Sequence, residues 1–179
     1  MPRDAVEQLL FVFDAAFDEA GEESLMTDLR SVTSELWTAV PAGGERCIRQ
    51  IAGHVGACKW MYDNFAFEDG RMSWNDPAGA LSVTMEEMQS VRSLGSREPG
   101  MEAVIDWLRE GHGRLRAHVA QLDDGELLRP RRPPEGPMKE TRWLIANLIR
   151  HDAYHAGEIN RTRSLLARTD GWAWESEAE

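Results

Sequence analysis

The sequence predicts an all-α domain, a four-helix bundle with long crossover loops. Its 179 residues contain several long stretches in which apolar residues recur at three- and four-residue steps, the spacing of an amphipathic helix. Prolines and glycines separate these stretches, and no segment keeps the apolar–polar alternation of a half-buried strand. Four long helices joined by at least two long connections are typical of a helical bundle with crossovers.

The first two helical stretches precede residue 70. Residues 4–30 are rich in helix formers, and Gly21 breaks or kinks the helix there. The segment VPAGG, residues 40–44, is expected to be a turn. A second helix is expected over about residues 45–67, where one face carries an apolar row: Ile48, Ile51, Val55, Cys58, Tyr62 and Phe65. His54 falls within or beside that row.

The remaining helices follow two loops. A loop over residues 68–80 leads to a short helix within 83–93. A third long helix begins after Pro99, and its apolar row comprises Val104, Leu108, Leu115, Val119 and Leu122. The proline-rich run at 128–137 excludes a helix or a central strand. The last long helix is expected over about residues 139–167.

Length and charge narrow the class of protein. We expect one domain over residues 1–168 and an acidic tail over 169–179, in which Trp172 and Trp174 could pack back onto the domain. The formal net charge of −11 repels phosphate backbones and anionic membranes, so neither nucleic acid nor a membrane is an expected partner. The apolar run at 9–13 is too short to span a membrane, and a cytoplasmic location follows.

The two cysteines are expected to be reduced thiols. Cys47 and Cys58 on one helix would lie roughly 16 Å apart along its axis, too far for a disulfide. Cys58 is one turn beyond His54, so it could reach a metal held there, or it could serve as a small buried apolar side chain.

The stretch HDAYHAGEIN, residues 151–160, carries the strongest chemical signal. His151 and His155 are spaced i, i+4, which places both imidazoles on one face of a helix, where they can bind one divalent ion. The two histidines interrupt an otherwise inward-facing row: Leu144, Leu148, Glu158 or Ile159, Thr162 and Leu166. Neutral rings in a core need partners, and a metal supplies one for each. Without a metal, the pair would be structural or exposed.

His54 is the candidate for a third ligand. Three imidazoles from two helices would leave one or more coordination positions open, as in catalytic rather than structural metal sites. Imidazole suits zinc, nickel, copper and iron, so the sequence alone does not select the ion. His112 and His118 are about 240° apart around the third long helix, and we expect both at the surface.

Two acids accompany the pair. Asp152 points about 100° away from His151, so it is a poor ligand on the same face but could orient a ligand histidine or balance a charge on a neighbouring helix. Glu158 is the candidate catalytic residue. It could accept a hydrogen bond from a ligand histidine, act as a general base for a bound water, or pair with Arg161 or Arg163.

The sequence HDAYH also resembles the zinc peptidase pattern H-E-x-x-H, with Asp152 in place of the glutamate that activates water. An aspartate is one methylene shorter, and no histidine follows His155 to supply a third ligand downstream. A metal-dependent hydrolase is therefore the least favoured function.

Three stretches, residues 40–70, 101–127 and 140–166, show a wider resemblance. The combination of one histidine on the second helix with H-x-x-x-H-x-G on the last helix is its most specific part. With the N-terminal helix, these stretches resemble the DinB-like, or YfiT-like, superfamily of small bacterial metal-binding four-helix bundles over nearly the whole chain. The resemblance implies crossover connections between the helices.

It also implies a site and its ligands. His54, His151 and His155 match the metal ligands of the superfamily, whose members hold nickel, zinc or a similar divalent ion with solvent in the open positions. Several members are similar to thiol-dependent transferases or isomerases that use mycothiol, bacillithiol or glutathione, and many others have no known activity. Arg, Ala, Gly and Trp are abundant here, as in bacteria with GC-rich genomes, which favours mycothiol.

Two hypotheses follow. The first is a metal-dependent S-transferase that joins a low-molecular-weight thiol, as co-substrate, to a small electrophile, because a divalent ion makes a thiolate available at neutral pH. Asn64, Trp60, Tyr62 and Arg161 are candidates to line its pocket. The second is a non-catalytic metal-binding, stress-related protein that acts through a partner or as a homodimer.

Overall fold

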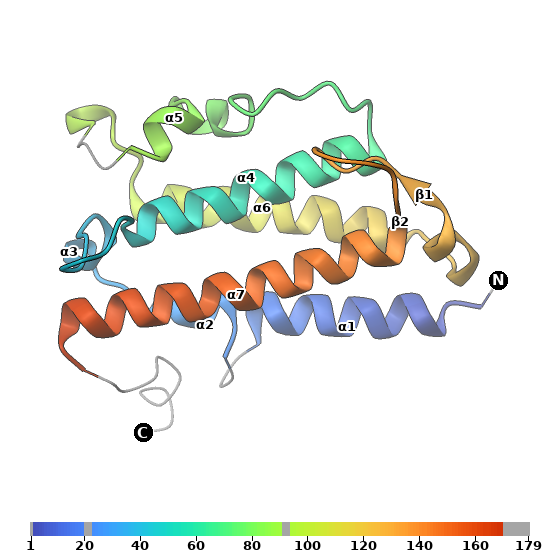
Figure 1. The fold of residues 1–179 in the computed structure, drawn as a ribbon, viewed down its shortest axis with the longest axis horizontal. Coiled ribbons are helices and arrows are strands. Elements are labelled where there is room, and N and C mark those ends of the chain that lie inside the picture. Colours follow the sequence, from blue (N-terminus) through green and yellow to red (C-terminus); the bar gives the residue numbers. More distant parts are fainter. Residues whose placement is uncertain (1, 20–22, 91–93, 170–179) are drawn as a thin grey trace.

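The computed structural model describes residues 2–19, 23–90 and 94–169. Within these ranges the fold is all-α, as predicted, with four long helices: α1 (Asp4–Asp18), α4 (Ile48–Phe67), α6 (Met101–Ala120) and α7 (Thr141–Ala167) (Figure 1). The shorter elements are α2 (Leu25–Arg30), α3 (Ser34–Trp37), α5 (Met85–Met88), the 3₁₀ turns η1 (Pro77–Leu81), η2 (Gly95–Arg97) and η3 (Asp124–Leu128), and the strands β1 (Pro130–Arg131) and β2 (Lys139–Glu140). Trp172 and Trp174 lie outside the described residues. No helix in the described ranges combines the length and the apolar character that crossing a membrane requires.

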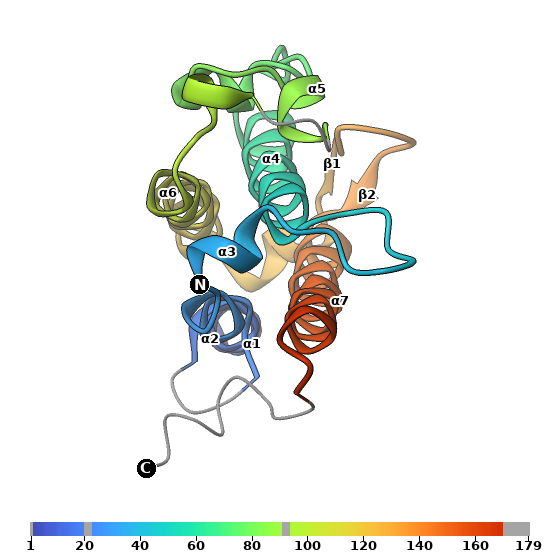
Figure 2. The same ribbon diagram turned by 90° about the vertical axis from the view of Figure 1, so that its left-hand side faces the viewer.

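The four long helices are arranged as a square in cross-section (Figure 2). α4 and α1 each pack against both α6 and α7, so α1 lies diagonally across from α4. α4 and α6 run parallel, since Gly56 faces Trp107 while Trp60, one turn on, faces Gly111. Because α4 and α6 are parallel, the segment that joins them must return along the length of a 20-residue helix, about 30 Å. The long segment 68–100 makes this return, and the predicted crossover loops are confirmed.

Glycines allow α4 and α6 to approach closely. A Cβ added to Gly56 would lie 2.2 Å from Cζ3 of Trp107, and one added to Gly111 would lie 2.7 Å from Nε1 of Trp60. The two indoles are also satisfied as hydrogen-bond donors, because Trp60 Nε1 donates to the Trp107 carbonyl at 3.2 Å and Trp107 Nε1 donates to the Pro77 carbonyl at 2.9 Å. Any larger residue at either glycine would force the helices apart.

α4 is buried on far more of its surface than the single apolar row predicted. α6, α7, α5 and η1 all pack on it. Its buried polar side chains are Arg49, Gln50, Lys59, Asp63 and Asn64. The sequence suggested one inward face because these polar residues interrupt the apolar pattern, whereas in the fold each lies against a neighbouring element.

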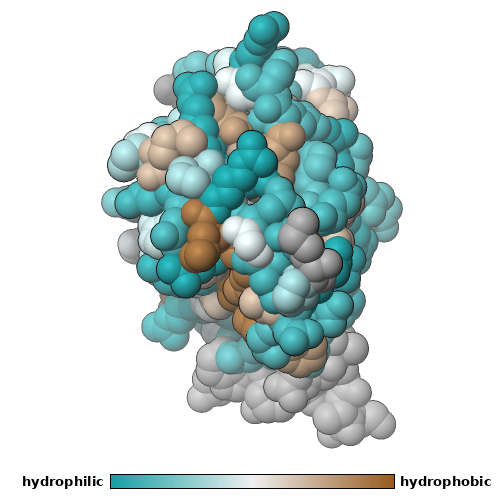
Figure 3. All heavy atoms as spheres, turned by 90° about the vertical axis from the view of Figure 1, so that its right-hand side faces the viewer, coloured by the Kyte–Doolittle hydropathy of each residue, from teal (hydrophilic) through white to brown (hydrophobic). Residues whose placement is uncertain are grey.

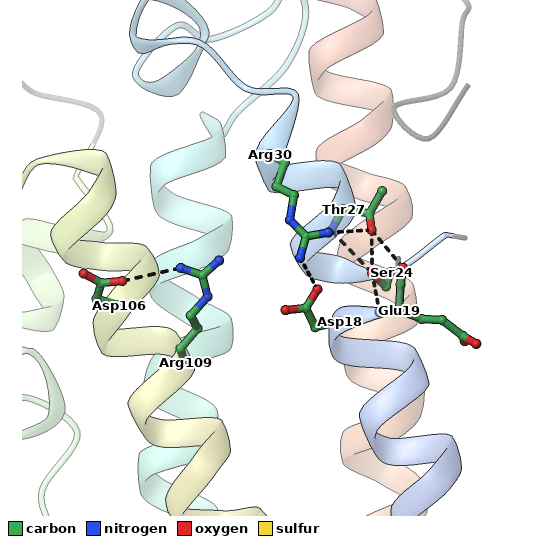
Figure 4. Close-up of polar contacts among 7 residues, drawn as sticks. All are labelled: Asp18, Glu19, Ser24, Thr27, Arg30, Asp106 and Arg109. Atoms are coloured by element: carbon green, nitrogen blue, oxygen red, sulfur yellow. Dashed lines mark hydrogen bonds and ion pairs between the residues drawn. The ribbon is translucent and has the colours of Figure 1, made fainter. Parts of the chain in front are cut away.

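The ends of the bundle are closed by short polar contacts. Asp124 Oδ1 accepts from the backbone N–H groups of Ala5 and Val6, both at 3.1 Å, and so caps the N-terminus of α1. At the other end of α1, Arg30 of α2 pairs with Asp18, as Figure 4 shows. Ser24 begins α2, with its hydroxyl accepting from Thr27 N at 3.3 Å. These contacts hold the end of α1 and the start of α2 on either side of Gly21, which itself lies outside the described residues.

The proline-rich run contains a small hairpin that the sequence did not reveal. Pro130 pairs with Glu140 and Arg131 with Lys139, and two residues per strand are too few for a periodic pattern. The loop between the strands lies on the side of the bundle where α4 meets α7 (Figure 2). The end of the bundle that carries the hairpin is mostly hydrophilic, with small hydrophobic patches (Figure 3). The hairpin therefore delivers loop residues to the α4–α7 interface.

A buried ion pair ties α4 to α7. The side chain of Lys59 is fully buried, and its Nζ donates to Asp152 Oδ2 at 2.6 Å. Nζ also lies 3.2 Å from Nδ1 of His112 and within 5.0 Å of the ring centroids of Phe13 and Phe17. Burial lowers the pKa of Lys59 and raises the pKa of Asp152, while their mutual attraction opposes both changes. Asp152 thus balances a charge on a neighbouring helix, one of its two predicted roles.

The prediction of a surface position for His112 is wrong. Its side chain is buried, and the ring stacks on Phe13 and Phe17 with centroid distances of 4.4 and 3.7 Å. The reason is that α1 covers this face of α6 with two aromatic rings. His118 is half-buried, with Nδ1 2.6 Å from Asp63 Oδ1.

Removing one partner of the buried pair should destabilise the fold. Lys59→Met would leave the Asp152 carboxylate buried without its counter-charge, and we expect a loss of about 3–5 kcal/mol in the free energy of unfolding. The double variant Lys59→Met/Asp152→Leu should recover most of that loss, because neither charge of the pair remains. Urea denaturation of both variants measures this. A double variant as unstable as the single one would contradict the account.

The buried histidine predicts how stability depends on pH. Burial, together with the neighbouring Lys59, lowers the pKa of His112 from 6.5 to about 2. Below pH about 6.5 the unfolded chain therefore binds a proton at His112 that the folded chain does not. As the pH falls, this difference lowers the free energy of unfolding by up to about 1.4 kcal/mol per pH unit. In His112→Asn, whose amide oxygen can still accept from Lys59, this slope between pH 6 and 4.5 should be smaller. An unchanged slope would show that His112 titrates normally in the folded state.

Candidate metal centre

Three histidines meet where α4 faces α7. One ligand atom from each of His54, His151 and His155 lies within 4.8 Å of the others. The Nε2 atoms of His54 and His151 are 3.2 Å apart. Two imidazole nitrogens bound to one ion at ordinary distances and angles are about 3.0–3.4 Å apart, so this separation suits a shared ion.

The helices bring the three rings together by simple geometry. His151 and His155 are one turn apart on α7 and their ring centroids are 4.4 Å apart. α4 runs antiparallel to α7, because Lys59 contacts Asp152 and the later Tyr62 contacts the earlier Asn147. This alignment places the His54 ring 5.1 Å from each of the two rings on α7.

The protonation and partners of the rings fit a metal ion. Burial, with help from neighbouring positive groups, lowers the pKa of His54 to about 4 and the pKa of His151 to about 3. Both rings are therefore neutral at pH 7 and carry a lone pair. In the described part of the chain, Nδ1 of His151 is buried without a hydrogen-bond partner. An ion at the cluster would bind Nε2 of His151, the atom that faces His54, so the buried Nδ1 is a separate feature of the ring.

His155 is oriented by an acid behind it. Its Nδ1–H donates to Glu158 Oε2 at 2.7 Å, and Arg46 Nη2 donates to Glu158 Oε1 at 2.6 Å. A carboxylate on Nδ1 fixes the tautomer and leaves the Nε2 lone pair for a ligand. Burial lowers the pKa of His155, while Glu158 opposes that change.

The contacts of Glu158 bear on two of its three predicted roles. It accepts from a candidate ligand histidine, as one hypothesis held. Its ion-pair partner is Arg46, which precedes α4, rather than the Arg161 or Arg163 expected from helical spacing. Sequence separation hid this partner, because Arg46 and Glu158 are brought together only by packing. The catalytic role of Glu158 stays a prediction.

Asp152 does not play the part of the glutamate in H-E-x-x-H. Its carboxylate is fully buried and points to Lys59 on α4. It is therefore held by an ammonium group in the core, away from any water that an ion at the histidines could activate. The structure gives a metal-dependent peptidase no general base at this position.

A cavity of about 290 Å³ opens beside the histidines. It lies between α4 and α7 and is closed by the loops that follow α4 and β1. Its lining residues are His54, Cys58, Met61, Tyr62, Trp74, Pro134, Glu135, Asn147, Leu148 and His151. Two candidate ligands line this cavity, so a small molecule in it could reach an ion bound by them.

The sequence predicted the lining of this cavity only in part. Tyr62 lines it, but Trp60, Asn64 and Arg161 are not among the described lining residues. Trp60 packs on α6, Arg161 is exposed, and Asn64 Oδ1 instead accepts from Met72 N at 3.0 Å and so holds the loop after α4.

Other lining residues were missed. Trp74, Pro134 and Glu135 come from loops, and Asn147 comes from α7. No periodic signal marks a loop residue that tertiary packing carries to a site.

The two cysteines are unpaired, as predicted. Cys47 is buried just before α4, and Cys58 is half-buried in the wall of the cavity. Cys58 Sγ lies 3.7 Å from Nε2 of His54. Burial raises the pKa of the Cys58 thiol to about 12, so without an ion the group is a neutral thiol.

Metal content should depend on the three histidines. We expect elemental analysis to find one divalent ion per chain in the wild type and a large loss in His54→Ala and His155→Ala. Glu158→Gln should weaken binding by about 10- to 100-fold, because it removes the carboxylate that orients His155. His118→Ala, outside the cluster, serves as the control and should retain the ion. Full stoichiometry in either ligand variant would defeat the assignment.

Comparison with known proteins gives the chain its family. No curated protein matches it. The DinB superfamily matches residues 16–159, most of the chain, including all three histidines, the whole of α4 and α6, most of α7 and only the last three residues of α1. The helical fold and the histidine cluster agree with this match, and the chain belongs to the DinB superfamily.

Proposed function

We propose that this protein is a divalent-metal-dependent S-transferase that joins a low-molecular-weight thiol to a small electrophile. The observation that carries the proposal is the position of the histidines: two of the three line a largely apolar cavity of about 290 Å³. A metal site that serves only structure is closed by protein ligands, whereas three imidazoles leave room for a substrate atom.

Nickel and zinc are the ions we propose for this site. Imidazole nitrogens suit both. When bound, such an ion would lower the pKa of a thiol and supply a thiolate nucleophile at neutral pH. The chain's own part is to hold the ligand rings neutral, which the burial of His54 and His151 achieves, and to orient His155 through Glu158.

The walls of the cavity would exclude water and select the substrates. Met61, Leu148 and Trp74 present apolar surface beside the histidines. Of the described lining residues, Glu135 alone is an acid or a strong base. An uncharged thiol of the mycothiol type therefore suits this cavity better than a thiol that carries carboxylates, because a carboxylate would meet Glu135 without a compensating cation.

Tyr62 is the residue we propose to stabilise charge on the electrophile. Asn147 Nδ2 donates to the Tyr62 hydroxyl oxygen at 3.1 Å, which leaves the hydroxyl proton available to a ligand. Burial raises the pKa of Tyr62, so the group stays protonated at neutral pH. A neutral donor held by a second side chain can stabilise negative charge that develops on an electrophile.

A panel of thiols and small electrophiles, tested with nickel- or zinc-loaded protein, examines this function. We expect turnover with an uncharged thiol, slower turnover with glutathione, and no turnover in His155→Ala. Tyr62→Phe should lower kcat by about 100-fold. Tyr154→Phe is the matched control, since the other tyrosine of the chain is exposed and its rate should not change.

Two outcomes would count against the transferase. One is the absence of turnover with every thiol, combined with no change in the spectrum of the bound metal when thiol is added. The other is turnover that survives in His155→Ala. The first outcome, with the metal retained, would favour the non-catalytic metal-binding alternative.

A further inference from the structure

Cys58 lies beside the histidine cluster without a role in the proposed reaction. It is one turn after His54 on α4, and its Sγ is 3.7 Å from His54 Nε2. It lines the same cavity as His54 and His151. Nickel and zinc bind thiols in proteins, so a cysteine beside three histidines can act as a ligand. A buried cysteine without such neighbours would give no such indication.

The helices present two i, i+4 pairs to each other. α4 carries His54 and Cys58, and the antiparallel α7 carries His151 and His155. Two residues from each of two facing helices can surround one ion with four donors. The pair on α7 can be identified from the sequence alone. Whether Cys58 faces the same site as His54 depends on which face of α4 meets α7.

The distance from Cys58 to His54 suits shared coordination. A thiolate at 2.3 Å and an imidazole nitrogen at 2.0–2.1 Å from one ion are about 3.6 Å apart at a tetrahedral angle. The observed separation is 3.7 Å. Cys58 is not part of the group whose ligand atoms all lie within 4.8 Å of one another. In the observed position its Sγ is therefore more than 4.8 Å from the ligand atom of at least one histidine of α7, and it would turn about its Cα–Cβ bond to reach an ion shared with them.

We infer that Cys58 is a fourth ligand, which binds the ion as a thiolate on the cavity side of the three histidines. The thiol proton leaves to solvent as the sulfur–metal bond forms. The inference rests on the metal-binding part of the proposed function and not on the transferase activity. With Cys58 bound, a substrate thiol would take a fifth position, to which zinc sites can expand. It adds a sulfur donor from α4 to the three imidazoles.

Cobalt(II) provides the test, because a thiolate ligand gives it an intense near-ultraviolet charge-transfer band that histidine does not. Metal-free protein would be titrated with cobalt in buffer without added thiols. We expect this band in the wild type and in Cys47→Ser, the matched control at the other cysteine. It should vanish in Cys58→Ser and Cys58→Ala, while the visible bands of histidine-bound cobalt remain. Competition with a chelator should show about 10-fold weaker binding or more.

The outcomes separate this inference from the proposed function. Visible cobalt bands without the sulfur band in the wild type would overturn the role of Cys58 and leave the histidine site intact. A sulfur band that persists in both Cys58 variants would also overturn it. If the wild type binds no cobalt, nickel or zinc, both the inference and the proposed function fail. Far-ultraviolet circular dichroism confirms that each variant is folded.

Discussion

The buried pair of Lys59 and Asp152 is the contact on which the arrangement of this bundle depends. All four long helices meet there: Lys59 on α4, Asp152 on α7, His112 on α6, and the rings of Phe13 and Phe17 on α1. A buried pair gains little net stability, because removing two charges from water offsets their attraction. Its value lies in alignment. Sliding α4 along α7 by one turn, about 5.4 Å, would leave both charges buried and unpaired.

The same alignment brings the three candidate metal ligands together. Asp152 follows His151 directly, and Lys59 is five residues after His54. The contact between Lys59 and Asp152 therefore also sets the position of His54 relative to His151. The acid and the histidine next to it in sequence point to different sides of α7, one into the core and one toward the cavity. A motif that resembles a peptidase signature therefore separates into two functions: Asp152 holds the helices together, and His151 faces the candidate ion.

The helix order determines what surrounds that ion. Because α4 and α6 are parallel neighbours, the chain must return along the bundle after α4. This loop carries Trp74, and the loop of the β1–β2 hairpin carries Pro134 and Glu135. These residues close a cavity that the long helices alone would leave open. The connections thus supply part of the cavity wall, whereas the helices supply the three histidines that could hold a metal.

The sequence by itself determined the elements and the candidate ligands. Helical periodicity located the long helices to within a few residues, and the i, i+4 spacing of His151 and His155, with His54 on an apolar helix, identified the imidazoles that the fold brings together. Only the tertiary structure decided that His112 is buried, that Glu158 pairs with Arg46, and that Cys58 approaches His54. The physical reason is that periodicity reports which face of a helix is apolar. It does not report which helix covers that face, and partners distant in sequence meet only through packing.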